Sequence, residues 1–513
     1  MTYDVIVVGG GHNGLAAGAL LSKEGRKVLI LEKRNLLGGV AAGEEFHPGH
    51  RTQGLLLDSS GLRPGLISEL ELESHGLRLR EDEPPTFIPS PSGKGLLLHA
   101  DAEKMQIGSA LSEKDNKSYG EFRTFLSRTR SILKHILDNA PPPITDRGTD
   151  GLLTLLSAGL RLRALGRDDM IELLRIAPMC VGDWVKDWFE DERLRCAVAG
   201  AAVEGTFMGP WSAGTVTSYL IRNALTERSV QGGPQAVVAA LNGAAKAAGA
   251  QIKTETGVAR INVSKGRVLG VTTDKGDDIR ADIVLSTADP KTTFHTLIAP
   301  THIPDGLDEQ IRNFRARGTT AKVNLALSAP LEFSQHPGER FERIRTGDVL
   351  DDIERAFDAV KYGEFSKSPH LDIKVSSIAD PSAAPENKHT VEILVHFAPY
   401  DLEGGWTDAK RAELGDAVLA QLERYAPGVK KAVAHAEVLT PKDLESRYGL
   451  AQGHIYHGEP FLDQLYALRP SLDCAQYATP IEGLYLGGSG SHPGGGVTGA
   501  PGQLCAQAVL AAG

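Results

Sequence analysis

The chain has 513 residues, more than one hydrophobic core usually organises, so we expect two closely associated domains. Hydrophobic residues make up 41% of the chain and charged residues 23%, values typical of soluble globular proteins that exclude a disordered or fibrous chain. The net charge is −10 and no long basic run interrupts it, which argues against nucleic acid as a partner.

The chain contains four widely separated cysteines: Cys180, Cys196, Cys474 and Cys505. Their spacing argues against a zinc site, a dithiol redox centre and a disulfide framework, and no His, Asp or Glu cluster shows metal-ligand spacing, so we expect no metal. Asp4 and the glycines that follow interrupt the apolar core of an export signal, and no apolar run reaches about 18 residues. We expect a cytoplasmic location, or the mitochondrial matrix in a eukaryote, with peripheral membrane contact left open.

The first predicted elements form a nucleotide-binding pattern. Tyr3–Val8 is apolar and mostly β-branched, which predicts a parallel strand buried on both faces, and a helix is predicted over Leu15–Lys23. Between them, Gly9, Gly11 and Gly14 fit G-x-G-x-x-G. In this pattern the first glycine permits a tight turn, the second lets the backbone approach a pyrophosphate, and the third lets the helix pack closely on the strand.

The next predicted strand ends in an acidic residue. Lys27–Leu31 is the strand and Glu32 follows it, about 20 residues after the glycine turn, where a carboxylate accepts hydrogen bonds from an adenosine ribose. A bare glycine pattern is weak evidence, but here strand, turn, helix, strand and acid stand in the required order. The sequence therefore predicts a dinucleotide site.

Two longer segments point to FAD through a resemblance. Glu32–Ala42 resembles the extension found in FAD proteins of the amine oxidase and phytoene desaturase superfamily, and Gly483–Val497 resembles the C-terminal flavin motif of the same superfamily. Together they closely resemble the second type of pyridine nucleotide-disulphide oxidoreductase domain-containing proteins, which are relatives of phytoene desaturase. The resemblance spans nearly the whole chain. One departure is Pro234-Gln235 after a glycine pair, where relatives usually have methionine and glycine.

The resemblance implies an α/β fold: a Rossmann-type FAD-binding domain of the glutathione-reductase and amine-oxidase kind, with an inserted α+β substrate domain and a helical cap. We expect the FAD-binding domain to comprise residues 1–80, 231–295 and 475–513, and the substrate-binding domain residues 81–230 and 296–474. Pattern and resemblance together assign these residues to FAD: Gly9, Gly11, Asn13, Gly14, Glu32, Lys33, Gly39, Val40, Val258, Gly488, Ser489, Gly495, Gly496 and Val497. Val258 would meet the adenine through its main chain.

Histidines are the candidates for acid–base roles. His492 lies inside the C-terminal flavin segment and is our candidate catalytic residue beside the reactive ring, although it could equally hydrogen-bond only its own loop. We expect His12 to be a structural residue of the turn. His454 and His457 face either the substrate or a domain interface.

Between the motifs, hydrophobic periodicity predicts helices over much of residues 112–230. Within them, Leu152–Leu165 is either an interior packing helix, which we favour, or an amphipathic helix that docks on lipid. The remaining expected elements are a helix over Pro234–Ala248, strands over Ile252–Val263, Arg267–Thr273 and Ile283–Ser286, antiparallel strands including Ala321–Leu327 and Val391–Phe397, and a final helix from about Val497 to Ala511. The glycine-rich run Gly494–Gly499 lacks a following strand and acid, so we reject a second nucleotide site there.

Flavin supplies hydride chemistry itself, so few side chains are mandatory. Through the resemblance we expect an FAD-dependent oxidoreductase acting on C–C or C=C bonds of a hydrophobic, isoprenoid or carotenoid-like small molecule. Two alternatives stay open: a flavin-dependent isomerase without net redox change, and a low-turnover flavin-binding regulatory protein. The oligomeric state and the electron acceptor are not predicted.

Overall fold

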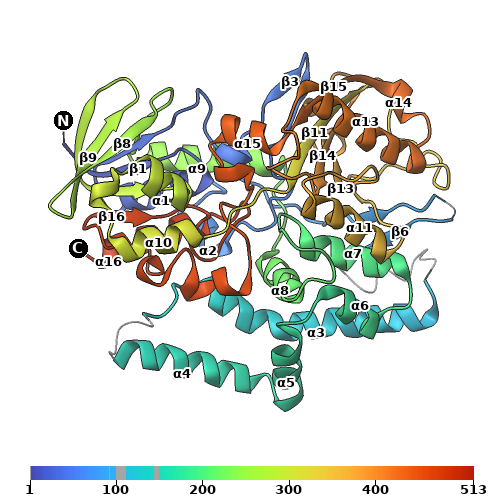
Figure 1. Ribbon diagram of the computed structural model, residues 1–513, viewed down its shortest axis with the longest axis horizontal. Coiled ribbons are helices and arrows are strands. Elements are labelled where there is room, and N and C mark those ends of the chain that lie inside the picture. Colours follow the sequence, from blue (N-terminus) through green and yellow to red (C-terminus); the bar gives the residue numbers. More distant parts are fainter. Residues whose placement is uncertain (1, 92, 100–110, 144–148) are drawn as a thin grey trace.

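The computed structural model of the protein describes residues 2–91, 93–99, 111–143 and 149–513. These residues form two lobes side by side, each built on a seven-stranded sheet, with a layer of helices beneath the second lobe (Figure 1). The N- and C-termini both lie in the first lobe.

The sheet of the first lobe is assembled from three separated stretches of chain. Its strands are β1 (Thr2–Val8), β2 (Val28–Leu31), β7 (Gln251–Lys253), β8 (Val258–Ser264), β9 (Arg267–Thr273), β10 (Asp278–Ser286) and β16 (Leu484–Leu486). In space the parallel strands run β7-β2-β1-β10-β16, and β9 and β8 continue antiparallel from the other part of β10. Apolar side chains from β1 are buried on both faces of this sheet, as parallel strands require.

Three helices from distant parts of the chain cover one face of this sheet. The helix α1 (His12–Lys23) contacts both α9 (Gly233–Ala247) and α16 (Ala500–Ala511). The approach of α16 is very close: a Cβ on Gly502 would lie 2.1 Å from the carbonyl oxygen of Asn13. This contact brings the C-terminal segment against the start of α1.

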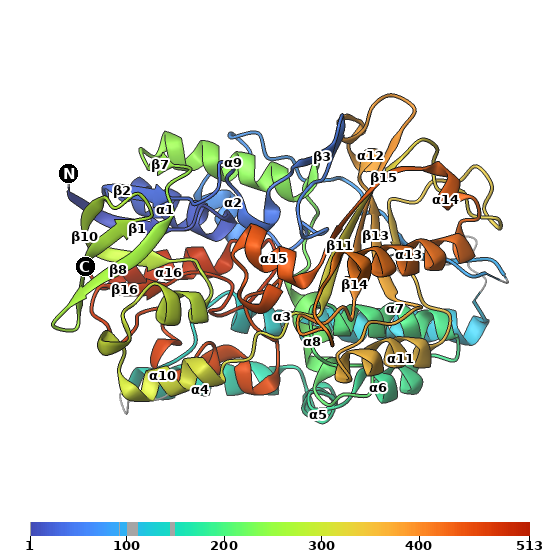
Figure 2. The ribbon, with the colours of Figure 1, turned by 45° about the horizontal axis from the view of Figure 1, so that its top comes forward.

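The second lobe has a mostly antiparallel sheet, as predicted. Its spatial order is β15 (Val433–Leu439), β11 (Thr320–Leu327), β14 (His389–His396), β13 (His370–Val375), β12 (Arg343–Arg345), β5 (Thr86–Ile88) and β6 (Leu96–Leu98), with β12 and β5 parallel. The apolar face of the sheet packs against α13 (Asp408–Tyr425). Figure 2 shows α7 (Glu192–Val203), α8 (Thr215–Leu225) and α11 (Leu350–Lys361) below the sheet.

The polar residues of β11 do not face solvent. Lys322 is 1% exposed, and its Nζ donates to the main-chain oxygens of Gly54 and Leu55 at 3.0 Å each. It also contacts Glu392 of β14 at 2.9 Å, and Glu392 in turn accepts the N–H of Gln53. The polar face of this sheet is therefore docked onto residues 53–55 of the first lobe.

The helical layer contains α3 (Glu113–Leu137), α4 (Thr149–Ala164), α5 (Arg167–Ile176), α6 (Val181–Trp188), α7 and α8. Phe122, Trp184 and Phe189 form its aromatic core, with ring centroids 5.2 Å apart between Phe122 and each of the other two. The predicted helical insertion is confirmed. Within it, α4 and α5 project away from the rest of the molecule (Figure 1), and because Leu156 and Leu160 are exposed, the favoured interpretation of residues 152–165 as an interior packing helix is wrong.

Several predicted boundaries are wrong: α1 begins at His12 rather than Leu15 and β10 at Asp278 rather than Ile283, and two further misses have local backbone reasons. The stretch predicted as one strand over residues 252–263 is split into β7 and β8, because Glu255 takes a left-handed φ of 50° between them. The last helix begins at Ala500 rather than near Val497, because Gly499 is left-handed with a φ of 70°. The predicted helix at residues 234–248 and the predicted strand at residues 267–273 match α9 and β9 within one residue.

The remaining elements are short connections: α2 (Pro64–Glu69), α10 (Asp305–Asn313), α12 (Ser376–Ala379), α14 (Val429–Ala432), α15 (Pro441–Tyr448), β3 (Glu45–His47) and β4 (His50–Arg51). Among the described residues, no helix is both long and apolar enough to cross a lipid bilayer.

Candidate functional site

The glycine turn lies at the end of β1, where the chain passes into α1. Gly9 has a φ of 100°, which favours glycine, and its N–H donates to the Leu31 oxygen of β2 at 2.8 Å. A Cβ on Gly14 would lie 2.0 Å from the Gly9 oxygen, so only glycine lets α1 pack this close to the strand. At Gly11 no atom comes nearer than 4.0 Å to the Cβ position. The backbone of Gly11 is thus open to a ligand.

Glu32 anchors this turn. Its two carboxylate oxygens accept the backbone N–H groups of Gly10 and Arg34, both at 2.8 Å, and the residue is 7% exposed. A carboxylate offers about four acceptor sites, so two stay available for ribose hydroxyls. The sequence prediction missed this structural contribution of Glu32, and the contact of Glu32 with a ribose stays a prediction.

The start of α1 meets the C-terminal segment directly. The His12 ring nitrogen Nε2 lies 3.1 Å from the Gly496 oxygen, and the Asn13 amide donates to the Ser489 hydroxyl at 3.2 Å. Burial, with the nearby His457, lowers the pKa of His12 to about 4, so its ring is neutral at pH 7 and donates from Nε2 to that carbonyl. The two segments that resemble flavin proteins are therefore neighbours in space.

The other predicted FAD residues lie around the same turn. Gly38 N–H donates to the Gly10 oxygen at 2.8 Å, which places Gly39 and Val40 beside the turn. Lys33 is exposed. Val258 is the first residue of β8, and it follows Thr256 by two residues. The N–H of Thr256 donates to the main-chain oxygen of Glu32 at 2.9 Å, which places the start of β8 near Glu32. Gly488 follows β16, and a Cβ there would lie 2.5 Å from the Thr287 oxygen. Their individual contacts with FAD stay predictions.

Two buried polar atoms that lack a hydrogen-bond partner among the described residues indicate whether these residues suit a flavin dinucleotide. Asn13 Oδ1, next to the open Gly11 backbone, is buried and has no hydrogen-bond partner among the residues that the structure describes. Arg469 Nε is also buried and has no partner in the described part of the chain, and a Cβ on Gly494 would lie 3.6 Å from it. Asn13 Oδ1 can accept a hydrogen bond and Arg469 Nε, near Gly494, can donate one. These two atoms and the glycine-rich backbone near them suit a long ligand that contacts both the glycine turn and the C-terminal segment.

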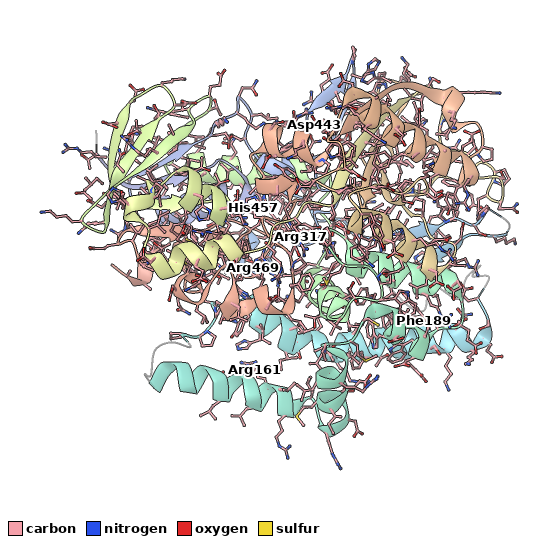
Figure 3. The ribbon with its side chains drawn as sticks, viewed as in Figure 1. Arg161, Phe189, Arg317, Asp443, His457 and Arg469 are labelled. Carbon is pink, nitrogen blue, oxygen red and sulfur yellow. The ribbon has the colours of Figure 1, made fainter. Side chains whose placement is uncertain are left out.

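Arg469 is held by main-chain carbonyls and lies over the ring of Phe314. It is 1% exposed, and its guanidinium donates to the oxygens of Glu459, Gln464, Tyr456, Gly458 and Ser489 at 2.9–3.3 Å. Burial lowers its pKa to about 10, so it stays charged at pH 7. Figure 3 shows Arg469, Arg317 and His457 gathered where the two lobes meet.

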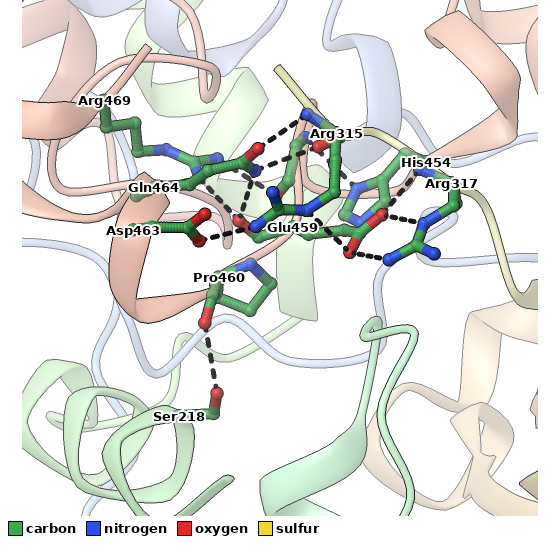
Figure 4. Close-up of polar contacts among 10 residues, drawn as sticks. Ser218, Arg315, Arg317, His454, Glu459, Pro460, Asp463, Gln464 and Arg469 are labelled. Carbon is green, nitrogen blue, oxygen red and sulfur yellow. Dashed lines mark hydrogen bonds and ion pairs between the residues drawn. The ribbon is translucent and has the colours of Figure 1, made fainter. Parts of the chain in front are cut away.

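Around Arg469 a polar network joins the lobes. Glu459 is fully buried and pairs with Arg317 at 2.8 Å, and the Gln464 side-chain oxygen accepts the Arg315 N–H at 2.6 Å (Figure 4). The sequence prediction missed this network, because its residues come from separate segments and meet only in the folded chain.

A cavity of about 290 Å³ lies between the lobes. One wall is Gly494–Thr498, which contains the predicted residues Gly495, Gly496 and Val497. The second wall is β12 with β13, and the third includes Ile221, Arg222 and Leu225 of α8. The glycine turn and Glu32 do not line it. The cavity therefore adjoins the C-terminal flavin segment and not the nucleotide end of the site.

The cavity wall is strongly charged. It contains five cations and three carboxylates: Arg222, Arg343, Arg345, Lys374, Arg469, Asp58, Glu204 and Asp372. Arg222 contacts Glu204 at 2.9 Å, and Tyr456 donates its hydroxyl to the same carboxylate at 2.6 Å. A purely apolar substrate does not account for this wall.

His492 lies outside the cavity lining, although its neighbour Pro493 contributes to it. Its Nε2 lies 3.0 Å from the Ile136 oxygen, and its ring packs edge-on against Tyr466. Burial lowers its pKa to about 4. The geometry gives His492 a structural partner, and its catalytic role stays a prediction that we do not carry further.

His454 also has a structural setting. It is 2% exposed, and its Nδ1 accepts the N–H groups of Tyr456 and Gly458 at 3.2 Å each. Burial lowers its pKa to about 3, so the ring is neutral. His457 is half-buried, and desolvation lowers its pKa. Neither lines the cavity.

One buried cluster contradicts the expectation that no metal-like spacing exists. His370, Asp372 and His396 have ligand atoms within 4.8 Å of one another, because β13 and β14 pair His370 directly with His396. However, Asp372 already contacts Arg345 at 2.5 Å and His396 at 2.8 Å. The adjacent guanidinium opposes a metal cation, so we interpret the cluster as an ion-pair network that reaches the cavity wall through Asp372 and Arg345.

Comparisons with known proteins agree with this geometry. Residues 92–510 match the family described as flavin containing amine oxidoreductase, and residues 7–58 match the NAD(P)-binding Rossmann-like domain. The chain belongs to the flavin-containing amine oxidoreductase family. It is thus a member of a family of flavin-dependent oxidoreductases.

Within this family the chain is similar to two kinds of relative. It is 34% identical to the rat (Rattus norvegicus) pyridine nucleotide-disulfide oxidoreductase domain-containing protein 2, over 99% of this chain and 93% of that protein. It is 25% identical to a phytoene desaturase of Fusarium fujikuroi, over 96% of this chain and 86% of that enzyme. The expected resemblance is confirmed.

Solved structures confirm the fold class. A putrescine oxidase solved with putrescine bound superposes with a TM-score of 0.63 at 16% identity, covering 100% of this chain and 99% of the other. The shared fold is an α/β Rossmann-like flavin-binding fold with a substrate domain.

Proposed function

We propose that this flavin-dependent oxidoreductase binds FAD without a covalent bond and oxidises a C–C bond of a hydrophobic small molecule to C=C. The observation that supports this most is the placement of the cavity, which has Gly494–Thr498 on one side and the substrate-lobe sheet on the other. Similarity to a phytoene desaturase supports the bond type.

FAD, when bound, supplies the hydride acceptor. The chain's own residues bind and orient: Glu32 holds the turn and offers acceptors to a ribose, and the open Gly11 backbone admits a pyrophosphate. Arg469 places a fixed positive charge beside Gly494, where negative charge on a reduced ring would be stabilised. The substrate would lose a hydride to FAD and, from the neighbouring carbon, a proton to water, and oxygen or a quinone would then take the two electrons from the reduced flavin.

Thiol chemistry is not part of this proposal. The four cysteines are free, and Cys196, Cys474 and Cys505 are buried. Burial raises the pKa of Cys474 to about 12, which leaves it protonated at pH 7. A reactive pair beside the cavity is absent from the described residues.

Peripheral membrane contact through α4 and α5 is part of the proposal. Leu156, Leu160, Ile171 and Leu174 are 50–70% exposed on these helices, which project from the body (Figure 1). Exposed apolar side chains gathered on one projection mark an interaction surface. A lipid surface suits it, because a hydrophobic substrate partitions into membranes.

Anaerobic stopped-flow mixing tests the redox assignment. Candidate isoprenoid hydrocarbons, NADH and NADPH are each mixed with the flavoprotein, and dithionite serves as the control that the flavin can be reduced. We expect bleaching of the flavin by a hydrophobic substrate, recovery with oxygen or a quinone, and no rapid, saturable bleaching by either nucleotide. Rapid bleaching by NADH or NADPH would instead show a reductase.

A further inference from the structure

The cations of the cavity wall differ in how completely they are neutralised. Arg345 and Arg222 each contact a carboxylate within 2.9 Å. Lys374 of β13 is 5% exposed, and its Nζ donates to the main-chain oxygen of Leu57 at 3.1 Å. Within the described residues, no carboxylate oxygen lies within 4.0 Å of this ammonium group. Lys374 is thus a buried cation at the cavity with a neutral partner.

Strand pairing sets a second cation against Lys374. Arg343 of β12 is its direct partner across the antiparallel ladder, and both residues line the cavity. Like charges directly opposite each other destabilise a strand pair. Arg343 donates to the Ser229 hydroxyl at 2.7 Å. Its ion pairs with Asp58 and Glu83 are longer, with nitrogen-to-oxygen distances of 3.6 and 3.7 Å.

The carboxylate nearest to these cations is engaged elsewhere. Asp58 accepts the hydroxyl of Ser60 at 2.6 Å and its N–H at 3.0 Å. Burial acts to raise the pKa of Asp58, but Arg343, the Ser60 hydrogen bonds and Lys374 outweigh burial and lower it. Asp58 is therefore ionised and hydrogen-bonded to its own turn, and it does not reach Lys374.

Apolar side chains share the same cavity. Ile221 and Leu225 of α8 form one side, and Leu56 and Val497 contribute from the first lobe. A ligand that fills this space meets hydrocarbon along α8 and two cations on the sheet. Such a lining suits an amphipathic molecule with one anionic end.

We propose that the substrate is a hydrocarbon that ends in a carboxylate, an isoprenoid or similar fatty acid, with its carboxylate between Lys374 and Arg343 and its chain against Ile221 and Leu225. A neutral hydrocarbon would leave the buried ammonium without a carboxylate in contact among the described residues, which is costly. This assignment rests on the proposed function, because it places the substrate in the cavity bounded by Gly494–Thr498.

The test compares ligands that differ only in the head group. Isothermal titration calorimetry measures the binding of geranate, geraniol and methyl geranate to the flavin-loaded protein and to Lys374→Met and Arg343→Met. Lys361→Met is the matched control, because Lys361 is ion-paired on α11 and lies outside the cavity lining. Flavin absorbance of every preparation reports whether the cofactor site is intact.

We expect geranate to bind wild type and Lys361→Met at least about tenfold more tightly than geraniol, as hydrogen bonds to charged groups imply. In Lys374→Met the preference for geranate over geraniol should shrink to less than about threefold, while the affinity for geraniol stays the same. Arg343→Met should also reduce the preference for geranate. Equal affinity for acid and alcohol, no binding of either, or an acid preference that survives both substitutions would overturn the inference. A chain without flavin would instead contradict the proposed function.

Discussion

At the scale of single residues, very few side chains tie the nucleotide end of the site to the rest of the first lobe. Glu32 receives N–H groups from both the turn and the following loop, and Asn13 and His12 reach the C-terminal segment. Each of these contacts depends on the side chain of Glu32, Asn13 or His12, so a single substitution tests its contribution.

Glu32→Gln should weaken FAD binding. An amide can accept only one of the two N–H groups and presents its own NH₂ to the other, while a ribose acceptor is lost as well. The expected cost of about 1–3 kcal/mol raises the Kd of FAD about 5- to 150-fold. Titration of the apoprotein with FAD, followed by flavin fluorescence, measures it. Glu24→Gln, at the exposed end of α1, is the control, and equal Kd values in the two variants would show that Glu32 does not contribute.

Lys374 predicts a pH dependence of acid binding. Burial, with Arg343 nearby, lowers the pKa of Lys374 to about 8, against the opposing effects of Glu342, Glu392 and Asp58. Below pH 8 the ammonium is charged and binds a carboxylate, and above it the charge and the affinity are lost. The affinity for the acid falls above pH 8, but the free energy of unfolding rises between pH 8 and 10.5, because in this range only the unfolded lysine still holds its proton. Geranate titrations from about pH 6 to pH 9.5 should show falling affinity above pH 8, which Lys374→Met should not show.

At the scale of elements, the contact between the two lobes depends on a buried ion pair. Lys322 of β11 and Glu392 of β14 are each at most 1% exposed and together bind residues 53–55. Removing one member leaves the other charge buried and unpaired, which costs more than the pair contributes.

Lys322→Met should lower the free energy of unfolding by about 3–5 kcal/mol. Urea titration followed by flavin release and far-UV circular dichroism measures the change. Lys410→Met removes a half-exposed surface pair with Glu413 and should cost less than about 1 kcal/mol. Lys322→Met combined with Glu392→Gln should recover part of the loss. If Lys322→Met and Lys410→Met unfold at the same urea concentration, the buried pair does not hold the lobes together.

The helices α4 and α5 predict a second effect at this scale. Leu160→Asp and Leu174→Asp should reduce co-sedimentation of the protein with phosphatidylcholine vesicles several-fold without changing flavin content, because they place charge on the apolar surface. Tyr362→Asp, at a residue 77% exposed beyond α11, is the control. Binding unaffected by the leucine substitutions, or self-association of the wild type in place of vesicle binding, would contradict the membrane assignment.

At the scale of the whole molecule, local patterns were enough to predict the nucleotide-binding turn of the first lobe, and the resemblance supplied the rest of that lobe. The glycine turn and the acid after β2 are set by backbone geometry over about 30 residues, and such geometry is visible in sequence. The helical layer and the antiparallel sheet were also predicted from periodicity. The strand break at Glu255 and the late start of α16 were missed, because single left-handed residues decided both.

The substrate side could not be predicted in the same way. Lys374, Arg343 and Arg469 come from three segments without a motif, and only strand pairing and lobe docking bring them to one cavity. The cluster of His370, Asp372 and His396 arises likewise from cross-strand pairing. Contacts of this kind depend on register over long sequence separations, which the composition of a segment does not reveal.

The central claim is that the glycine turn and the C-terminal segment together hold one noncovalent FAD. Acid precipitation of the purified protein, followed by absorbance and mass spectrometry of the supernatant, tests it most directly. We expect the yellow colour in the supernatant, with FAD close to one molecule per chain. Colour that stays with the pellet would contradict noncovalent binding, and a colourless protein that takes up no added FAD would contradict the site itself.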